Sequence, residues 1–350
     1  MDESELHNQL LSNLSDDYDK TTGYLPSDLL KSISIVLAGL YAKLDSVEQL
    51  IDVDNLTGEK LEQFIEQRTG ITKTKATNSV GVITVNGNGQ INIGDLFETK
   101  GGIQFQAIET KLITTTGTVN IEASQSGSVG NVPANQIVQI PVTISGITSI
   151  KNPAATHDGF DAETDDSLRD RYYLALKTPA TSGNQYHYLQ WAKSIAGVGD
   201  AKVFPLEQGD NTVEVVIIDQ NKQPASTSLV ASVQEYIDPN SAGLGSEVAP
   251  IGCFCYVTAA IALSINVQVS VTKSAGYTDA DVLTNVQASI TAYLKEVAFK
   301  STYVSYAKLG EAILNSVGVE DYSGLTVNSQ TDNVNIADKE VAILGGVTIV

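Results

Sequence analysis

The densest group of side chains able to do acid–base chemistry lies within residues 158–171, which contain six acidic residues and two arginines. Paired carboxylates enclosed in a pocket can serve as general acid and general base. The same residues fit the solvated start of a helix, because Thr164 can cap it and Asp165 and Asp166 would face the positive end of its dipole. We favour the helix start, since catalysis would require a pocket and perturbed pKa values that this pattern does not supply.

Two cysteines and three histidines are the other candidates for chemistry. Cys253 and Cys255 stand two residues apart in an apolar strand, a poor geometry for a disulfide, so we expect buried free thiols. The histidines are spaced too widely from one another and from the cysteines for a metal site. A segment around Asn86 resembles a calcium loop, but an Asp occupies the last ligand position and a strand precedes it. The sequence therefore predicts no catalytic residue, no cofactor and no metal.

Motifs typical of enzymes are missing from the sequence. We find no Gly-x-Ser-x-Gly elbow, no phosphate loop, no dinucleotide fingerprint and no His-Glu-x-x-His. The many carboxylates leave one alternative open, a carbohydrate-binding or polysaccharide-degrading surface module. A sugar cleft is usually lined with aromatic residues, and the single tryptophan argues against one. We expect a protein that is not an enzyme.

Charge excludes two classes of partner. The chain has 21 basic and 41 acidic residues and a net charge of −20. Nucleic acids and anionic membranes both require clustered cations, so we expect neither as a partner. The charge-free run between Glu247 and Lys273 could suggest a membrane span, but its apolar and polar residues alternate with the period of a half-buried strand. The acidic N-terminus is unlike a signal peptide, so we expect synthesis in the cytoplasm.

The elements that position these residues indicate an α+β, multidomain fold. We expect an N-terminal helical segment (residues 1–75), a Gly-rich β domain (76–157), a helical junction (158–197) and C-terminal α+β modules (198–350). In the β domain, residues 80–85 and 91–93 flank turn-forming residues and predict a hairpin. A second hairpin is predicted across residues 208–211, and a helix capped by Thr278 should follow the long strands.

The N-terminal segment contains the strongest helical pattern in the chain. After a polar stretch that ends at Pro26, apolar residues recur at steps of three and four from Ser27 onward. These residues are Leu29, Ile33, Val36, Leu37, Leu40, Leu44, Val47 and Ile51. Such a stripe packs either on the β domain of its own chain or on helices of another chain, and both possibilities remain open. The stripe is our candidate subunit interface.

Two further helices are predicted in the junction. The first places Leu168, Tyr172 and Leu176 on one face and turns Arg169 and Asp170 outward. The second should begin with a capping box formed by Ser182 and Gln185. Its apolar face is expected to hold Tyr186, Leu189, Ala192 and Ile195. Together they predict a bent pair of helices between two unlike halves of the chain.

The junction resembles the baseplate J family of contractile phage tails and related particles. A Gly-Phe-Asp-x-Glu-Thr-Asp run leads into Leu-Arg-x-Arg, then Trp-Ala, then Gly-Val with a proline eight residues after that glycine. The residues that carry this resemblance are Gly159, Asp161, Glu163, Thr164, Asp165, Leu168, Arg169, Arg171 and Trp191. Gly127 to Ala134 and Asn152-Pro153 also fit, and the helical segment matches through Thr57-Gly58-Glu59, Leu61 and Gly70-Ile71. The resemblance therefore extends from about residue 21 to the C-terminus.

The resemblance implies a structural wedge subunit of a baseplate. Such a subunit pairs with other copies of itself and with a second, smaller baseplate wedge protein. The wedges connect the hub, tube and sheath to the tail fibres at the periphery, and they re-pack during contraction. The implied location is the tail baseplate of a virion, a tail-like bacteriocin or another contractile injection system.

Overall fold

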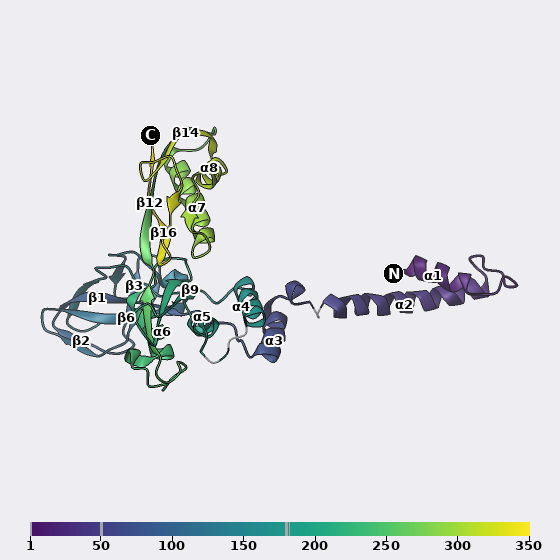
Figure 1. The fold of residues 1–350 in the computed structure, drawn as a ribbon, viewed down its shortest axis with the longest axis horizontal. Coiled ribbons are helices and arrows are strands. Elements are labelled where there is room, and N and C mark those ends of the chain that lie inside the picture. The colour runs from purple at the N-terminus through teal and green to yellow at the C-terminus, as the bar shows by residue number, and fades with distance from the viewer. Residues whose placement is uncertain (1, 50–51, 179–180, 182) are drawn as a thin grey trace. The chain divides into compact units, whose positions relative to one another are not determined.

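The computed structural model describes residues 2–49, 52–178, 181 and 183–350, and its elements are those of an α+β protein (Figure 1). The chain separates into two compact units, and the division passes through one helix. The first unit joins Met1–Thr72 to Thr164–Tyr173, and the second joins Lys73–Glu163 to Leu174–Val350. The predicted α+β class and multidomain character are confirmed.

Two helices that pack along each other begin the first unit. Helix α1 spans Glu3–Ser12 and helix α2 spans Leu25–Gln49. The sequence analysis did not predict α1, although the capping box between Asp2 and Glu5 is a local signal for it. Helix α2 starts just before Pro26, whose missing N–H costs no hydrogen bond in a first turn.

The rest of the first unit is a small helical core. Its elements are η1 (Val53–Asn55), α3 (Gly58–Thr69) and α4 (Asp165–Lys177), the last continuing into the second unit. Their apolar side chains bury one another, and Leu61, Ile65 and Leu168 are fully enclosed. This cluster contains no described residue of α2, so it forms without the α2 stripe.

Strands β1 to β8 of the second unit build a nearly closed barrel. Six of them form an antiparallel sheet in the order β7-β3-β4-β6-β1-β8, whose edge strands contact each other, and β2 pairs with β5. The bounds are β1 Asn78–Gly87, β2 Gly89–Ile91, β3 Leu96–Thr99, β4 Gln104–Ala107, β5 Lys111–Ile113, β6 Thr116–Ser126, β7 Ile137–Gln139 and β8 Ile147–Lys151, with a short turn η2 at Ser128–Gly130. Side chains such as Phe97, Phe105 and Ile121 fill the interior.

The predicted hairpin between residues 80–85 and 91–93 is wrong. Strand β1 pairs with β6 and β8, whereas β2 pairs with β5. The intervening glycines have another purpose: a Cβ on Gly87 or Gly89 would lie 2.2 Å from a carbonyl oxygen of the segment at residues 145–146. Pairing between distant strands that share one core overrides the local turn preference.

The central module is a three-stranded sheet covered by helices on one face. Its elements are α5 (Gln185–Ser194), β9 (Val198–Pro205), β10 (Thr212–Asp219), α6 (Thr227–Ile237), η3 (Pro239–Ser241) and β11 (Phe254–Ala259). The strand order is β11-β10-β9. The hairpin predicted across residues 208–211 is confirmed by the antiparallel pairing of β9 with β10. Val215, Ile217 and Val257 point from the sheet into the core shared with α5 and α6.

The C-terminal module places two helices on one face of a second sheet (Figure 1). Its elements are β12 (Ile261–Lys273), α7 (Asp279–Val297), β13 (Tyr303–Val304), α8 (Tyr306–Leu314), β14 (Val319–Val327), β15 (Val334–Asn335) and β16 (Glu340–Ile349). The predicted alternation in β12 is confirmed, because Ile265, Val267 and Val269 are buried while Asn266 and Gln268 are exposed. Thr278 caps α7 in a capping box, as predicted at this position.

Candidate functional site

The candidate interface stripe lies on α2 and is mostly exposed to solvent. Five of its residues are more than half exposed: Leu29, Val36, Leu40, Leu44 and Val47. Ile33 is 41% exposed, Leu37 is half-buried, and Ile51 lies outside the described residues. Large apolar side chains gathered on one exposed helix face are typical of a surface that binds another molecule.

Helix α1 covers a different side of α2 and leaves the stripe open. Ser27 and Ser34 are buried on that side, and Nε2 of His7 lies 3.1 Å from the carbonyl oxygen of Ser27. Leu6 is buried in the same contact. Despite this contact, Leu29, Val36, Leu40, Leu44 and Val47 of α2 remain more than half exposed.

Within the described chain, residues Leu25–Asp45 are also long enough and apolar enough to cross a membrane by length and composition. The mean hydropathy of the window is 1.3, and 11% of it is buried. A search for charge-free runs misses this segment because Asp28, Lys31 and Lys43 interrupt it. A lipid surface and a partner helix are therefore the two candidates for covering the same amphipathic face.

The acidic segment before α4 is solvated only in part, because two of its carboxylates accept backbone hydrogen bonds and Glu163 is buried. Asp161 accepts the backbone N–H of Ser128 at 2.8 Å and also its hydroxyl, and these bonds lower the pKa of Asp161. Glu163 is buried and accepts the N–H of Thr74 at 3.0 Å. Gly159 lies where a Cβ would approach a carbonyl oxygen to 2.6 Å. These residues fix the chain path as structural acceptors.

Thr164 and Asp165 serve the starts of two helices. The Oγ1 of Thr164 accepts the N–H of Ser167 at 3.2 Å, which confirms the predicted cap of α4. Asp165 accepts the N–H of Gly58 at 2.7 Å, in the first turn of α3. A carboxylate at a helix start satisfies an N–H group that has no partner within the helix. Asp165 therefore couples α4 to α3.

Arg169 was expected to turn outward, and this expectation is wrong. Its guanidinium donates to the carbonyl oxygens of Val53 at 3.2 Å and Leu56 at 2.9 Å. The planar group reaches two carbonyls at once, and it also pairs with the Asp three residues before it. Arg171 donates to the carbonyl oxygen of Thr72 at 3.3 Å. Both arginines of the family motif thus stabilise backbone that lacks regular helix partners.

The start of α5 differs from the predicted capping box. Ser182 lies outside the described residues, and Gln185 is the first residue of the helix. The cap is Asn184, whose side chain accepts the N–H of His187 at 3.0 Å. Asn is as good a cap as Ser, so composition alone did not separate the two positions.

The buried faces of the two junction helices also differ in part from the prediction. In α5 the buried residues are Tyr188 and Ala192, whereas Tyr186 is exposed. In α4 the predicted face is correct for Leu168 and Tyr172, but Leu176 is 57% exposed. Trp191 stacks on the ring of His187 with centroids 4.3 Å apart and packs at the rim of the core.

Asp158 brings serine, histidine and carboxylate together without forming a nucleophilic site. The hydroxyls of Ser226 (2.5 Å) and Ser228 donate to the carboxylate itself, and Nδ1 of His157 lies 3.0 Å from it. Nucleophilic catalysis needs the histidine between the serine and the carboxylate. Burial raises the pKa of Asp158, but the three partners more than offset burial and lower it overall. The cluster joins the end of the barrel to the start of α6.

Metal-binding and thiol chemistry have little basis in the described residues. No three His, Cys, Asp or Glu side chains of this part of the chain lie close enough to hold a metal ion. Cys255 is buried and Cys253 is half-buried, and burial raises the pKa of the Cys255 thiol to about 12. The sulfur of Cys253 accepts the hydroxyl of Tyr188 at 2.9 Å. Both sulfurs belong to the packing of the central module.

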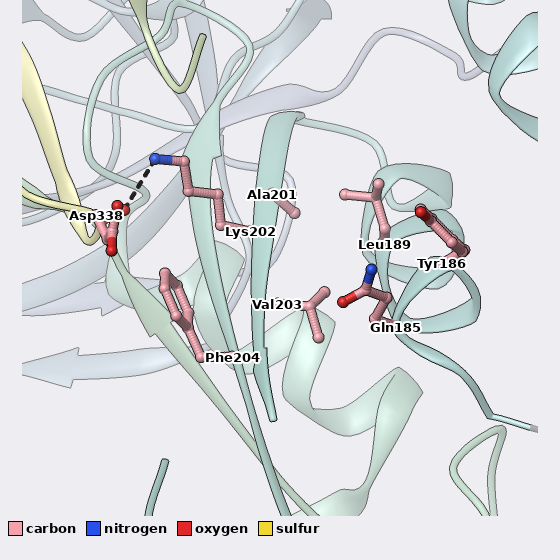
Figure 2. A pocket seen from close by; sticks show the side chains of 8 residues that line it. All are labelled: Gln185, Tyr186, Leu189, Ala201, Lys202, Val203, Phe204 and Asp338. Carbon is pink, nitrogen blue, oxygen red and sulfur yellow. Dashed lines mark hydrogen bonds between the residues drawn. The ribbon is translucent and has the colours of Figure 1, made fainter. Parts of the chain in front are cut away.

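A cavity of about 370 Å³ lies beside strand β9 in the central module (Figure 2). Its lining residues are Gln185, Tyr186, Leu189, Ala201, Lys202, Val203, Phe204 and Asp338. Figure 2 shows Ala201 and Val203 facing α5, while Lys202 and Phe204 extend to the other side, toward Asp338. The sequence analysis did not predict this cavity, since its walls come from three segments that only the fold brings together.

Comparisons with known proteins match nearly the whole second unit to one family. Residues 75–159 match the model described as the Baseplate J-like protein barrel domain. Residues 180–259 match the Baseplate J-like central domain, and residues 265–350 match the Baseplate J-like protein C-terminal domain. The boundaries of these matches coincide closely with the barrel, central and C-terminal modules described above.

One of the relatives extends the match over nearly the full length. The phage-like element PBSX protein XkdT of Bacillus subtilis is 30% identical over 98% of this chain and 95% of its own. Baseplate protein gp47 of Escherichia phage Mu is 28% identical over 49% of this chain and 50% of its own. A chain in the structure of the anti-feeding prophage baseplate covers 97% of this chain and 90% of its own, with 10% identity and a TM-score of 0.42.

Proposed function

Because the chain belongs to the baseplate J family, we propose that it is a structural wedge subunit of the baseplate of a contractile phage tail or phage-tail-like particle. The wedge would connect the hub, tube and sheath to the fibre-bearing periphery and re-pack during contraction. The partners would be other copies of the chain, a second and smaller wedge protein, and neighbouring hub, sheath and fibre components.

The exposed stripe of α2 is the observation that carries this proposal. Leu29, Ile33, Val36 and Leu40 follow one another at steps of four, three and four, which is the spacing of a seam between two helices. Leu44 and Val47 continue the face. In the proposal these residues meet a helix of another subunit, whose apolar side chains would remove the stripe from water.

The proposal also assigns roles to the expected domains. Residues 1–75 would form the inter-subunit bundle, residues 158–197 the joint, and residues 198–350 the modules that meet other copies. The acidic surface would steer neighbours and limit nonspecific self-association. The bonds of Asp165, Arg169 and Arg171 support a defined joint, since they tie α4 to the segments around α3.

The carbohydrate-active alternative gains no support from the cavity beside β9. Glycoside hydrolysis by the usual mechanism requires two carboxyl groups facing one sugar ring. The lining of this cavity includes one carboxylate, that of Asp338, and the amine of Lys202 donates to the backbone carbonyl oxygen of the same residue at 3.0 Å. Glycan binding or turnover of cell-wall polysaccharide by the purified chain would reinstate the alternative.

The test compares charge substitutions on two exposed leucines. We expect Leu40→Asp to weaken association with itself or with co-encoded tail proteins at least tenfold, because a carboxylate in an apolar seam loses hydration without a partner. Leu112→Asp on β5 is the matched control, since Leu112 is 68% exposed outside the stripe. Light scattering and copurification give the oligomeric state, and circular dichroism checks folding.

A flotation assay with anionic and neutral vesicles separates the two candidates for covering α2. The proposal expects the chain to stay with its protein partners and to leave both vesicle types unbound. Flotation that Leu40→Asp abolishes, together with a persistent monomer in the presence of every co-encoded neighbour, would overturn the assembly role.

A further inference from the structure

The cavity of Figure 2 lies at the open edge of a sheet. Strand β9 is bordered by β10 on one side, and no other described strand borders it on the opposite side. Ala201 and Val203 belong to the sheet face covered by α5, whereas Phe204 belongs to the face turned to the C-terminal module. Because residues from both faces line one cavity, that cavity lies beside the strand edge (Figure 2).

Hydrogen bonding shows which backbone groups reach this edge. The N–H of Leu206 donates to the carbonyl oxygen of Thr212 at 2.8 Å, so these two residues form a bonded pair. Bonded and non-bonded pairs alternate along an antiparallel ladder. Val203, opposite Val215, therefore belongs to a non-bonded pair and directs its N–H and C=O away from β10.

Several other backbone groups along this edge are already bonded or lack a donor. The carbonyl oxygen of Gly199 accepts the amine of Lys222 at 2.6 Å. The N–H of Ala201 donates to the carboxylate of the residue before it at 3.0 Å, and Pro205 has no N–H. Among the described residues none bonds to the N–H or C=O of Val203. Native sheet edges are commonly protected in this way. The open N–H and C=O of Val203, in the central stretch of β9, therefore mark a specific place where a further strand can pair.

We propose that this stretch of β9 binds an extended peptide segment of a partner protein, which adds to the central sheet as a fourth strand. A backbone in extended conformation supplies the acceptor and donor that Val203 lacks. The opposite wall presents Leu189 and the ring of Tyr186, and it suits an aliphatic side chain. The amine of Lys202 and the carboxylate of Asp338 both lie on the other side, so the site favours a segment without net charge.

Two matched variants of one residue test the site. Val203→Pro removes the N–H at the open edge, and it spares the β10 ladder because Val203 does not bond to β10. Val203→Ala keeps the N–H and serves as the control. The probe is the acetylated peptide amide Thr-Val-Thr-Val-Thr, titrated into isotope-labelled chain by nuclear magnetic resonance. We expect saturable shifts around residues 198–205 in wild type and Val203→Ala, and at least tenfold weaker binding by Val203→Pro.

A variant on the facing helix guards against misfolding of β9. Gln185→Trp fills the cavity from an exposed position on α5 and should weaken binding of the same peptide at least tenfold. Equal binding by wild type, Val203→Pro and Gln185→Trp would overturn the proposal. So would the absence of saturable shifts in the wild type.

Hydrogen exchange in the assembled particle shows whether the open edge of β9 is paired there. The inference of a partner protein rests on the proposed assembly role. Hydrogen exchange is therefore measured at Val203 and, separately, along α2. We expect exchange of the Val203 amide to slow at least tenfold on assembly. Unchanged exchange at Val203 beside a protected α2 would refute the strand site alone, whereas failure of the chain to enter any particle would refute the assembly role.

Discussion

Helices α2 and α7 carry similar apolar stripes and have opposite surroundings. In α7, the residues Val282, Val286 and Ile290 are fully buried against the sheet of their own module. In α2, Leu40 and Leu44 are 55% and 60% exposed. The difference arises because α7 packs against β16 and α8 of its own module. Helix α2 contacts the short α1, which covers a different side from the stripe. A stripe predicts a helix and its buried face, but not which chain covers that face.

The prediction with the largest expected effect compares the loss of stability caused by alanine substitutions in the two stripes. We expect Ile290→Ala to destabilise the C-terminal module by about 3 kcal/mol, because the fully enclosed side chain leaves a cavity. Leu40→Ala in the isolated chain should change stability by less than about 0.5 kcal/mol, as for other exposed positions. Urea denaturation followed by circular dichroism measures both. Equal losses would mean that the α2 stripe is already covered within one molecule.

The contrast also explains what the sequence could predict. The period of apolar residues located α2, α7 and β12, since each buries or offers one face. It missed α1, whose few apolar residues give a weak pattern. It also misassigned the partner of β1, because strand pairing is decided by closure of the barrel rather than by turn residues.

In the candidate functional site, too, the sequence could not predict the contacts between distant segments. The motif residues of the junction were found by resemblance, yet the inward position of Arg169 and the burial of Glu163 depend on segments about 90 to 115 residues earlier in the chain. The cavity beside β9 is formed by α5, the strand edge and Asp338, which no local pattern connects. Contacts over such separations arise only when the modules have folded.

A second prediction asks whether the core of α3 and α4 is self-contained, as α7 is and α2 is not. Arg169→Ala removes charge-assisted bonds to Val53 and Leu56 and leaves their carbonyls to water. We expect a loss of about 2 kcal/mol in the stability of this core. Arg169→Lys should recover only part of it, because one ammonium cannot reproduce the planar fork. Hydrogen exchange on α3 reports the loss, and a parallel increase along α2 would contradict the independence of the two regions.

The third prediction uses pH to measure the stability of the central module, at Asp219 of β10, independently of α2. Burial raises the pKa of Asp219 to about 6 and Asp158 adds to this, although backbone N–H groups at Gln223 and Asn221 and the charge of Lys295 lower it. The folded state therefore keeps this proton up to a higher pH than the unfolded chain does. Its contribution to stability is present at low pH and is lost as pH rises from about 4 to about 6.

Asp219→Asn isolates this contribution from those of other carboxylates. The difference in unfolding free energy between wild type and variant should change by on the order of 1 kcal/mol across that interval and be constant above it. The asparagine oxygen can still accept the N–H of Gln223, which Asp219 now accepts at 2.7 Å. Denaturant titrations at several pH values measure the difference. A difference independent of pH would show that the carboxyl titrates normally.

The smallest effect has the opposite sign and tests the α2 face itself. Gly39 is exposed within α2, and a Cβ added there would meet no atom within 4 Å. Alanine favours a helix over glycine by about 1 kcal/mol, so Gly39→Ala should stabilise α2 by roughly 0.5–1 kcal/mol in the isolated chain. Thermal melting of the helical signal measures this gain. If a partner helix packs closely beside Leu40, the added methyl group should also weaken association, since close helix contact leaves little space for it. A stabilised monomer that associates less is the result that would distinguish α2 most clearly from α7, where stability and packing cannot be separated.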